Sequence, residues 1–461
     1  MVGGFKLSAG SLSLLAAAGV LLVGGTSAQA ADLGGDCCAD LEERIAELEA
    51  TTARKGNRKV SLTISGQVAK AVMFWDDGIE SNQYVVDNDN TQTRFRMLGK
   101  AKIVDGWEAG YLIEIGLDNA SSDGVTQWDP NASGLPAPDQ YLGGGTGGGS
   151  SFMEVRQSKW FIKSKELGQV TVGLGSGAQD DLYKWGNVGK AYSDAELHYN
   201  GRMLIRGTDG RTFRVSSSAT SAHLNWDGVA NNLDLSRTNN VRYDSPEIAG
   251  FVASASWGAD DIWDMALRYD QKFGNFHFKA GVAYTEDSDT TGADPLSRGN
   301  ETKDFVASVG LSEKTTGLYV YGAGGSREID DQPFVNGTQV DDEAYYYYAQ
   351  VGITRDLISL GSTNFHVDYG YYDGWGNGLR VRNAIDATST TENFVITDSE
   401  TQRWGFGVTQ NIKAADMDLY ALFNYYETDL TTTRAGGVGP DSLKLATEDW
   451  FGIVTGARIQ F

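Results

Sequence analysis

The chain ends in WFGIVTGARIQF, residues 450–461, and this stretch decides the fold. Counted in steps of two back from Phe461, one face of the stretch is mostly apolar. The other face carries Gln460, Arg458, Gly456 and Gly452, with Val454 as the exception. A period of two predicts a β-strand with one polar and one apolar face. We therefore expect the carboxyl end to be built into a sheet rather than left to fray.

The amino end predicts export from the cytoplasm. Lys6 precedes an apolar run around Leu14 to Val23, and Ala28-Gln29-Ala30 forms a small-x-small cleavage pattern. This combination is typical of a secretory signal peptide, since the apolar run is too short to span a membrane. We expect residues 1–30 to be removed. A buried N-terminal helix is the alternative.

The composition excludes a nucleic-acid partner and suits a barrel. Asp and Glu outnumber Lys and Arg by 61 to 38, a net charge of −23, with no basic stripe to offset it. The 58 Gly, 21 Tyr and 11 Trp, with only 7 Pro, are typical of long strands, aromatic belts and polar loops. No later apolar run could span a membrane as a helix, but barrels hide their lipid face in alternate residues. The 2 Cys are the adjacent Cys37 and Cys38, so no disulfide framework holds the fold.

Residues 31–57 differ from the rest of the chain. Apolar and small residues fall at heptad a and d positions, namely Leu41, Ile45, Leu48 and Thr52. Two heptads alone make a marginal helix. We predict a short periplasmic coiled-coil stalk, and a frayed charged linker remains the alternative.

From Lys59 onward the pattern is that of strands. Period-two alternation predicts strands near 59–75, 92–104, 107–118, 151–163, 168–176, 237–245, 250–258, 262–270, 275–286, 303–312, 317–325, 343–355, 363–373, 401–412, 417–428 and 448–461. Their linkers alternate between short and long, except for a short one near 259–261. An even strand count with short turns at one rim and long loops at the other is the connectivity of an outer-membrane barrel. A two-sheet sandwich would not sort its loops in this way.

The predicted fold is therefore all-β: a 16-stranded antiparallel transmembrane β-barrel over residues 58–461. Every strand edge in a bilayer must be paired, so the last strand has to close against the first. This accounts for the strand that runs to the last residue.

Two stretches resemble a known family. NNVRYDSPEIAGF, residues 239–251, is similar to the strand and turn that follow the third loop of general diffusion porins of Gram-negative bacteria. CCADLEERIAELEATTARKGNRKVSLTISGQV, residues 37–68, resembles the opening of alphaproteobacterial porins. The resemblance implies a non-enzymatic, passive channel for small hydrophilic solutes and ions in the outer membrane. It also implies a homotrimer whose barrels are narrowed by an inward-folded third loop, here 177–236. Lys70 and Lys159, predicted to face outward, favour a subunit contact there over lipid.

The resemblance also implies a charged pore constriction, with cations on the wall and carboxylates on the loop. Alternation places Arg94, Arg96 and Lys100 on one face, and Arg156 and Arg237 match positions of constriction arginines in the family. Gln67 stands where some relatives place a lysine, so the wall would be weaker there. Either a bulge in 151–163 or Trp160 in the lumen would explain why Arg156, Trp160 and Ile162 share a face.

The acidic side of the constriction is predicted on the third loop. Its candidates are Asp180, Asp181, Asp194 and Glu196, each of which could instead be a solvated loop charge. Acidic surface loops, such as DDGIE at 76–80 and REIDDQ at 327–332, could be solvated or could bind lipopolysaccharide through divalent cations.

Other chemistries find no support in the sequence. The four histidines are far apart and lack ligand spacing, and neither glycine-rich stretch continues into a phosphate loop, so we expect no metal and no cofactor. Two rival functions stay open. A substrate-specific channel would need an aromatic ladder in the lumen, for which Tyr346 and Tyr348 are the only hint, and an adhesin or scaffold would need a plugged lumen.

Overall fold

The computed structural model describes residues 59–117, 120–131, 153–216, 221–235, 237–258, 261–288, 301–330, 334–335, 338–382, 394–434 and 442–461. The predicted signal peptide and coiled-coil stalk, residues 1–57, lie outside the described residues. Among the described residues, no helix is long and apolar enough to cross a membrane.

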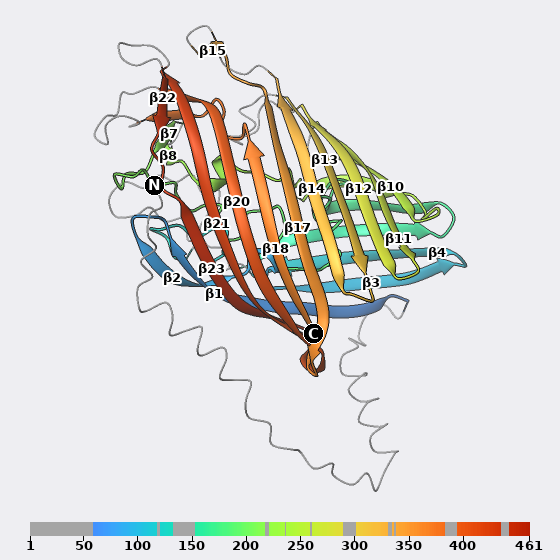
Figure 1. Ribbon diagram of the computed structural model, residues 1–461. Helices are drawn as coiled ribbons and strands as arrows, with labels where there is room; N and C mark the ends of the chain where they lie inside the picture. Colours follow the sequence, from blue (N-terminus) through green and yellow to red (C-terminus); the bar gives the residue numbers. More distant parts are fainter. Residues whose placement is uncertain are drawn as a thin grey trace. The chain divides into compact units, whose positions relative to one another are not determined.

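Alternating sequences form the long strands of the wall (Figure 1). They are β1 (Ser61–Asp76), β2 (Ser81–Asp87), β3 (Arg94–Val104), β4 (Trp107–Gly116), β5 (Glu154–Ser164), β6 (Gly168–Gly175), β9 (Thr238–Asp244), β10 (Phe251–Gly258), β11 (Ile262–Phe273), β12 (Phe276–Asp287), β13 (Thr302–Glu313), β14 (Leu318–Ile329), β17 (Glu343–Ile358), β18 (Gly361–Asp373), β20 (Phe394–Ile412), β21 (Met417–Arg434) and β23 (Trp450–Gln460). Shorter pieces lie in the loops: β7 (Arg214–Ser216), β8 (Ser221–His223), β15 (Phe334–Val335), β16 (Thr338–Gln339), β19 (Arg380–Arg382), β22 (Ser442–Leu445) and the 3₁₀ turns η1 (Asp89–Thr91), η2 (Trp226–Gly228) and η3 (Lys413–Ala415).

The wall closes on itself as a 16-strand antiparallel barrel, as the sequence predicts. Each long strand pairs with the next, except that β2 and β3 both pair with β1. At the seam, β23 pairs with β1 over ten residues, from Gln67 opposite Gln460 to Asp76 opposite Phe451. Closure removes the edges that a bilayer cannot solvate. Turns such as that between β11 and β12 mark one end of the barrel, the short-turn end. The loops mark the other, the long-loop end.

The second strand of the barrel is interrupted. Residues 70–76 of β1 pair with β2, and residues 61–67 of β1 pair with β3. β2 and β3 are therefore two parts of one strand of the wall. Residues 88–93 between them leave the wall, and we call them the inlet segment. The sequence analysis predicted a long loop over residues 76–91. That prediction was wrong for residues 81–87, which form β2. The six residues of the inlet segment do not disturb the period-two alternation of β2 before them or of β3 after them. The sequence pattern therefore gives no sign that the two pieces belong to one strand.

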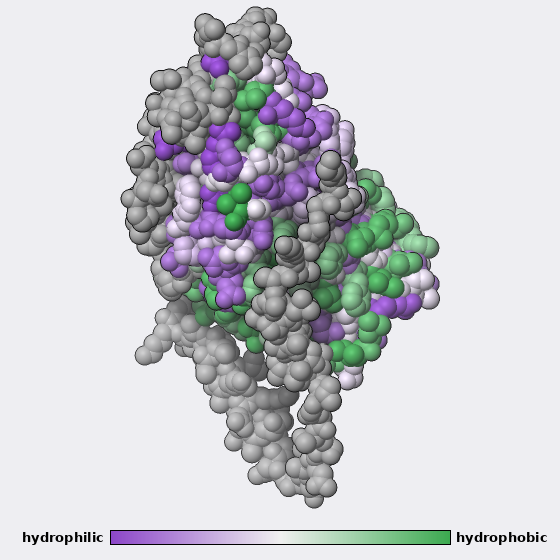
Figure 2. All heavy atoms as spheres, turned by 60° about the vertical axis from the view of Figure 1, so that its left-hand side comes forward, coloured by the Kyte–Doolittle hydropathy of each residue, from purple (hydrophilic) through white to green (hydrophobic). Residues whose placement is uncertain are grey.

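Alternate residues of the strands face outward or into the lumen. Outward positions carry exposed apolar side chains, such as Val68, Trp257 and Val367. Figure 2 shows hydrophobic residues gathered on the right-hand side of the view and mostly hydrophilic residues over the rest of the coloured surface. This is the pattern expected of a barrel with a lipid-facing band.

A β-bulge at Arg156 corrects one prediction. The register between β4 and β5 shifts here, from Glu114 opposite Gln157 to Ile115 opposite Val155. One extra residue reverses the alternation on either side of it. Trp160 therefore faces outward and is 48% exposed. Lys159, predicted to face outward, instead pairs with Leu112 on the lumen side of the wall, so that prediction was wrong.

The core lies inside the barrel, between the third loop and the wall. The third loop (residues 176–237) joins β6 to β9 and contains β7, β8 and η2. Its apolar and aromatic residues form one buried cluster with lumen-facing residues of β13, β14, β17, β18, β20 and β21. The third loop therefore folds inward, as predicted.

Candidate functional site

Lumen-facing hydroxyl groups hold the third loop across the barrel. Tyr321 on β14 donates its phenol O–H to the main-chain carbonyl of Tyr183 at 2.6 Å. Tyr372 on β18 donates to the carbonyl of Ala195 at 2.7 Å. A phenol is long enough to reach from the wall to the loop and satisfies a buried carbonyl that has no sheet partner. The loop is thus fixed to the strands that are far from its own ends in the sequence.

Arg403 on β20 fixes the middle of the same loop. Its Nη1 donates to the carbonyl of Asp194 at 2.6 Å, and its Nη2 donates to Ser193 Oγ at 2.5 Å. Asp368 on β18 supplies the counter-charge, with a carboxylate oxygen 3.3 Å from Nη2. The arginine is 1% exposed. A buried guanidinium is tolerated because it is both paired and hydrogen-bonded.

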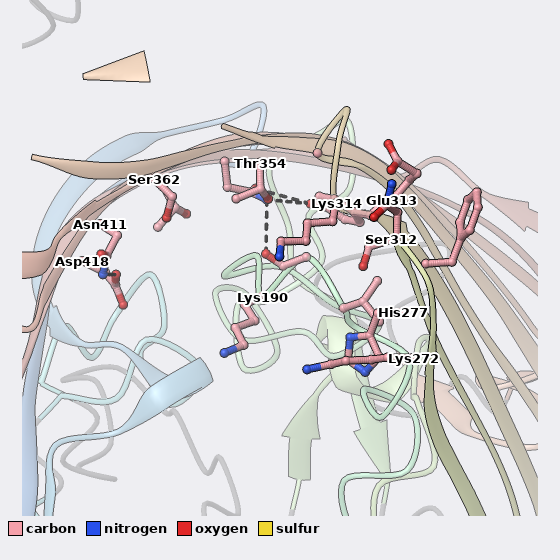
Figure 3. Close-up of a pocket in the computed structure, with 18 of the residues that line it drawn as sticks. Lys190, Lys272, His277, Ser312, Glu313, Lys314, Thr354, Ser362, Asn411 and Asp418 are labelled. Carbon is pink, nitrogen blue, oxygen red and sulfur yellow. Dashed lines mark hydrogen bonds between the residues drawn. The ribbon is translucent and has the colours of Figure 1, made fainter. Parts of the chain in front are cut away.

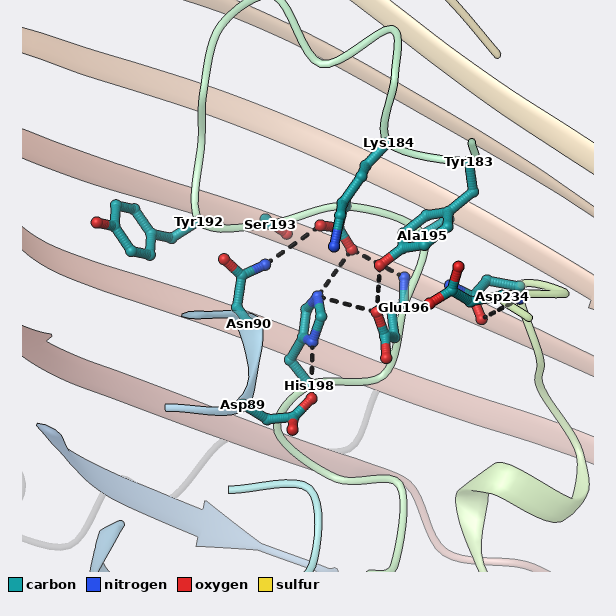
Figure 4. A network of polar contacts seen from close by, with 12 residues as sticks. Asp89, Asn90, Tyr183, Lys184, Tyr192, Ser193, Ala195, Glu196, His198 and Asp234 are labelled. Carbon is teal, nitrogen blue, oxygen red and sulfur yellow. Dashed lines mark hydrogen bonds and ion pairs between the residues drawn. The ribbon is translucent and has the colours of Figure 1, made fainter. Parts of the chain in front are cut away.

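The inlet segment meets the third loop at His198 (Figure 4). Asp89 Oδ2 lies 3.1 Å from His198 Nδ1, and Asp194 Oδ1 lies 2.9 Å from Nε2. Ionised carboxylates only accept hydrogen bonds, so a carboxylate beside each ring nitrogen favours the doubly protonated imidazolium form of His198. Burial acts to lower the pKa of His198, but Asp194 and Glu196 raise it well above 6.5. Burial acts to raise the pKa of Asp194, and His198 outweighs it, giving about 2.

Three arginines converge on one buried carboxylate at the opposite wall. Arg94 Nη1 lies 3.7 Å and Arg156 Nε 3.0 Å from Glu114 Oε1, and Arg96 pairs with its other oxygen. Glu114 itself is fully buried, whereas the Arg96 side chain is 44% exposed. Glu154 also lies 3.3 Å from Arg156 Nη1, so three guanidinium groups face two carboxylates and this cluster keeps one excess positive charge.

Three carboxylates of the third loop gather near this wall. Asp180, Asp181 and Asp234 bring oxygen atoms within 4.8 Å of one another. Lys184 pairs with Asp181 at 2.7 Å, and the Asp181 side chain is 51% exposed. Burial acts to lower the pKa of Arg237, but Asp180 and Asp181 raise it, and Glu114 adds to the effect. Arg237 therefore lies within electrostatic range of both the arginine cluster and the acidic group.

Two groups could offer ligands to a metal ion. The first is the Asp180 group, and the second is Asp89, Glu196 and His198. In the second group each histidine nitrogen already lies beside a carboxylate oxygen, and the imidazolium form that this favours has no lone pair to offer a metal ion. In the first, the Lys184 ammonium and Arg237 already supply positive charge. Among the described residues, both groups are therefore better explained as networks of ion pairs than as metal sites.

The sequence model of the Gram-negative porin family matches residues 14–431. The chain belongs to the Gram-negative porin family. Members of this family form diffusion channels in the outer membrane, and this is the function of the chain. No curated protein sequence matches it significantly.

Two solved outer-membrane proteins are similar to this porin at low sequence identity. The anion-selective porin from Comamonas acidovorans is 15% identical, with a TM-score of 0.51, covering 87% of this chain and 100% of its own. OmpT, an outer membrane protein of Vibrio cholerae, is 14% identical with a TM-score of 0.49, covering 88% of this chain and 99% of its own. At 15% identity the likeness to the Comamonas porin bears on the fold alone.

The predicted basic residues of the porin fall into three environments. Arg94, Arg96 and Arg156 come together around Glu114, whereas Lys100 lies apart, 3.8 Å from Glu108. Arg237 lies just before β9, beside the acidic group. The predicted lining residue Gln67 does not face an open path. It is buried, and its amide donates to Thr91 Oγ1 at 2.7 Å, which holds the inlet segment in place.

The predicted acidic residues divide between two places in the porin. Asp180 and Asp181 share the acidic group, and Asp180 is buried there. Asp194 is buried against His198, and Glu196 lies beside them with 32% of its side chain exposed. The sequence reasoning missed Glu114, Asp89 and Arg403. Glu114 could have been found from its place opposite the lumen-facing arginines of the neighbouring strand.

The two tyrosines that hinted at the aromatic ladder of a substrate-specific channel are not accessible to a solute. Tyr346 and Tyr348 do face the lumen, but they are 0% and 3% exposed. They pack in the core that joins the third loop to the wall. Their role is to seat the loop.

Proposed function

We propose that small hydrophilic solutes diffuse through this porin along a path that passes between the arginine cluster and the third-loop carboxylates. The observation that carries the proposal is the partial exposure of Arg96 and Asp181, with 44% and 51% of their side chains accessible. Arg237 links the two groups electrostatically. Opposite charges across a narrow aqueous path create a transverse field that orients polar solutes and disfavours apolar ones.

The test is single-channel conductance of detergent-extracted protein in a planar bilayer under a salt gradient. We expect discrete conductance steps with mild cation selectivity, because the net charge of −23 biases the field at the mouth. A reversal potential of anion sign would contradict the selectivity. A protein that inserts without conducting would instead favour the plugged barrel, which the extensive packing of the third loop keeps as the second candidate.

A homotrimer is part of the proposal. Lys70 on β1 faces outward with its side chain 45% exposed, and its one described ion pair is with the buried Asp87 at 2.5 Å. A cation on the lipid face near the midplane costs roughly 2–4 kcal/mol. A neighbouring subunit over β1 to β3 would cover this charge in polar surroundings. Closure of the conductance in thirds would support the trimer.

Orientation and surface partners follow from the same reasoning. We place the short turns, the stalk and the carboxyl end in the periplasm and the long loops at the cell surface, where they would meet lipopolysaccharide. Within the acidic stretch 76–80, Asp77 would contribute little to lipopolysaccharide binding, because it is buried and pairs with Arg206 at 2.9 Å. Protease accessibility of the loops in intact cells tests the orientation.

A further inference from the structure

A cavity lies at the short-turn end of the barrel, and no member of the Asp180, Asp181 and Asp234 group lines it. It has a volume of about 770 Å³. The tip of the third loop bounds it on one side, around Gly189, and the ends of β11 to β14 bound it on another, with the last strands completing the wall. Figure 3 shows most of its lining residues.

Three lysines from three different elements point their ammonium groups into this cavity (Figure 3). Lys190 comes from the third loop, Lys272 from the end of β11, and Lys314 from the turn between β13 and β14. Within the described part of the chain, none of the three has a carboxylate within 4.0 Å. His277 lies beside Lys272, and its Nε2 is engaged by Asp270 at 2.7 Å.

The carboxylates that line the cavity are already engaged elsewhere. Glu313 accepts hydrogen bonds from the main-chain N–H groups of Thr315 and Thr316, at 2.8 and 2.6 Å. Asp418 pairs with Arg458 at 2.7 Å and accepts from Asn411 at 2.8 Å. The lining therefore has four cationic side chains, those of the three lysines and Arg458, and two carboxylates, those of Glu313 and Asp418, which leaves an excess of positive charge. This is unexpected in a chain whose net charge is −23.

The backbone holds Lys190 in place. Its φ is 54°, in the left-handed region that non-glycine residues rarely adopt. Gly189, just before it, packs against the ring of Tyr319, where a Cβ would lie 2.1 Å from the ring. Asn364 donates to the Gly189 carbonyl at 3.2 Å. The loop tip is thus seated tightly, and the strained residue at its end is the one that directs a charge into the cavity.

We propose that this cavity binds small polyvalent oxyanions, such as phosphates or polycarboxylates. Each ammonium group has three donors and no acceptor, so three of them arranged around one space suit a solute with several anionic oxygens. This anion site is an addition to the proposed function. It depends on that function in one respect, because solutes reach the cavity through the channel. An acidic protein repels anions elsewhere, so this cavity would retain them at one end of the path.

The test is block of the KCl current by inorganic phosphate and, separately, by citrate, each added to one side of a planar bilayer at low salt. The test variant is K190Q/K272Q/K314Q. The control is K165Q/K413Q/K444Q, which removes three exposed lysines that do not line the cavity. Each exposed ion pair contributes modestly, so the half-blocking concentration should rise about tenfold in the test variant and stay unchanged in the control. Block should be stronger when the anion is added on the side that the short-turn end faces. Phosphate and citrate represent the two classes of oxyanion.

The proposal would be overturned if phosphate and citrate blocked the wild type, the test variant and the control equally. It would also be overturned if they reduced the current no more than added chloride does at the same ionic strength. Conductance in KCl alone reports on the proposed function separately. If the wild type does not conduct, equilibrium dialysis of radiolabelled phosphate against the three detergent-solubilised proteins decides the binding without a current. Equal retention by all three would then overturn it.

Discussion

Gly66 and Phe461 complete the closure of the barrel by exchanging two main-chain hydrogen bonds. The Gly66 N–H donates to the Phe461 carbonyl at 2.9 Å, and the Phe461 N–H donates to the Gly66 carbonyl at 3.1 Å. The last residue of the chain is thus part of the sheet. Its ring lies over Gly66 on the outer face, where a Cβ would meet the ring at 2.5 Å and the Arg94 carbonyl at 2.8 Å.

The first prediction is that Gly66→Ala destabilises the folded barrel by about 1–3 kcal/mol, because overpacking displaces either the ring or the neighbouring strand. The measurement is the temperature at which the folded band is lost in semi-native electrophoresis. Gly322→Ala is the matched control, since Gly322 also lies on the outer face and a Cβ there meets nothing closer than 3.5 Å. Equal shifts in both variants would show that the ring over Gly66 does not constrain the seam.

The second prediction concerns Arg403. Replacing it with Met leaves Asp368 buried without its ion pair and frees the carbonyl of Asp194, so we expect a loss of roughly 3–5 kcal/mol in unfolding free energy. The third loop should also fluctuate more, which open-channel current noise would report. Arg355→Met, at an exposed position of β17, is the control. Noise and stability equal to those of the control would mean that the tyrosine contacts alone seat the loop.

The barrel itself was predictable because lipid imposes one rule on every strand. Apolar residues must face outward at a period of two, and loops must sort to one end, so both patterns remain readable in the sequence. The prediction for Lys159 failed where that period is broken. The single bulged residue Arg156 reverses the faces beyond it, and no local property of the sequence fixes whether a bulge or a lumen-facing Trp160 resolves the conflict.

The site was only partly predictable. Arg94 and Arg96 lie on a regular strand, so their common face follows from spacing alone. Asp194 and Glu196 lie on a loop whose path depends on contacts with distant strands, such as that of Arg403 with the Asp194 carbonyl. Two residues apart in the sequence, one is buried and the other partly exposed. Long-range contacts of this kind leave no periodic signal.

The third prediction is a pH dependence that passes through His198. Because the folded pKa of His198 lies above its unfolded value of 6.5, its stabilisation is complete below 6.5 and is lost as the pH rises through the folded pKa. Asp194 acts in the opposite sense, and its contribution is lost only as the pH falls through about 2. The difference in melting temperature between wild type and His198→Gln should therefore shrink toward alkaline pH. A difference that is constant from neutral to alkaline pH would contradict the imidazolium bridge.

The fourth prediction tests the charges of the proposed constriction through ion selectivity. Arg96→Gln should shift the reversal potential toward cations, and Asp181→Asn should shift it toward anions, because each removes a partly exposed charge from one side of the path. An exposed charge is worth less than about 1 kcal/mol, so each permeability ratio should change by only a few-fold. The shifts should shrink at high salt, where screening shortens the reach of both charges. If neither variant moves the reversal potential while conductance persists, ions pass elsewhere in the lumen, and the arginine cluster serves to hold the wall and the inlet segment together.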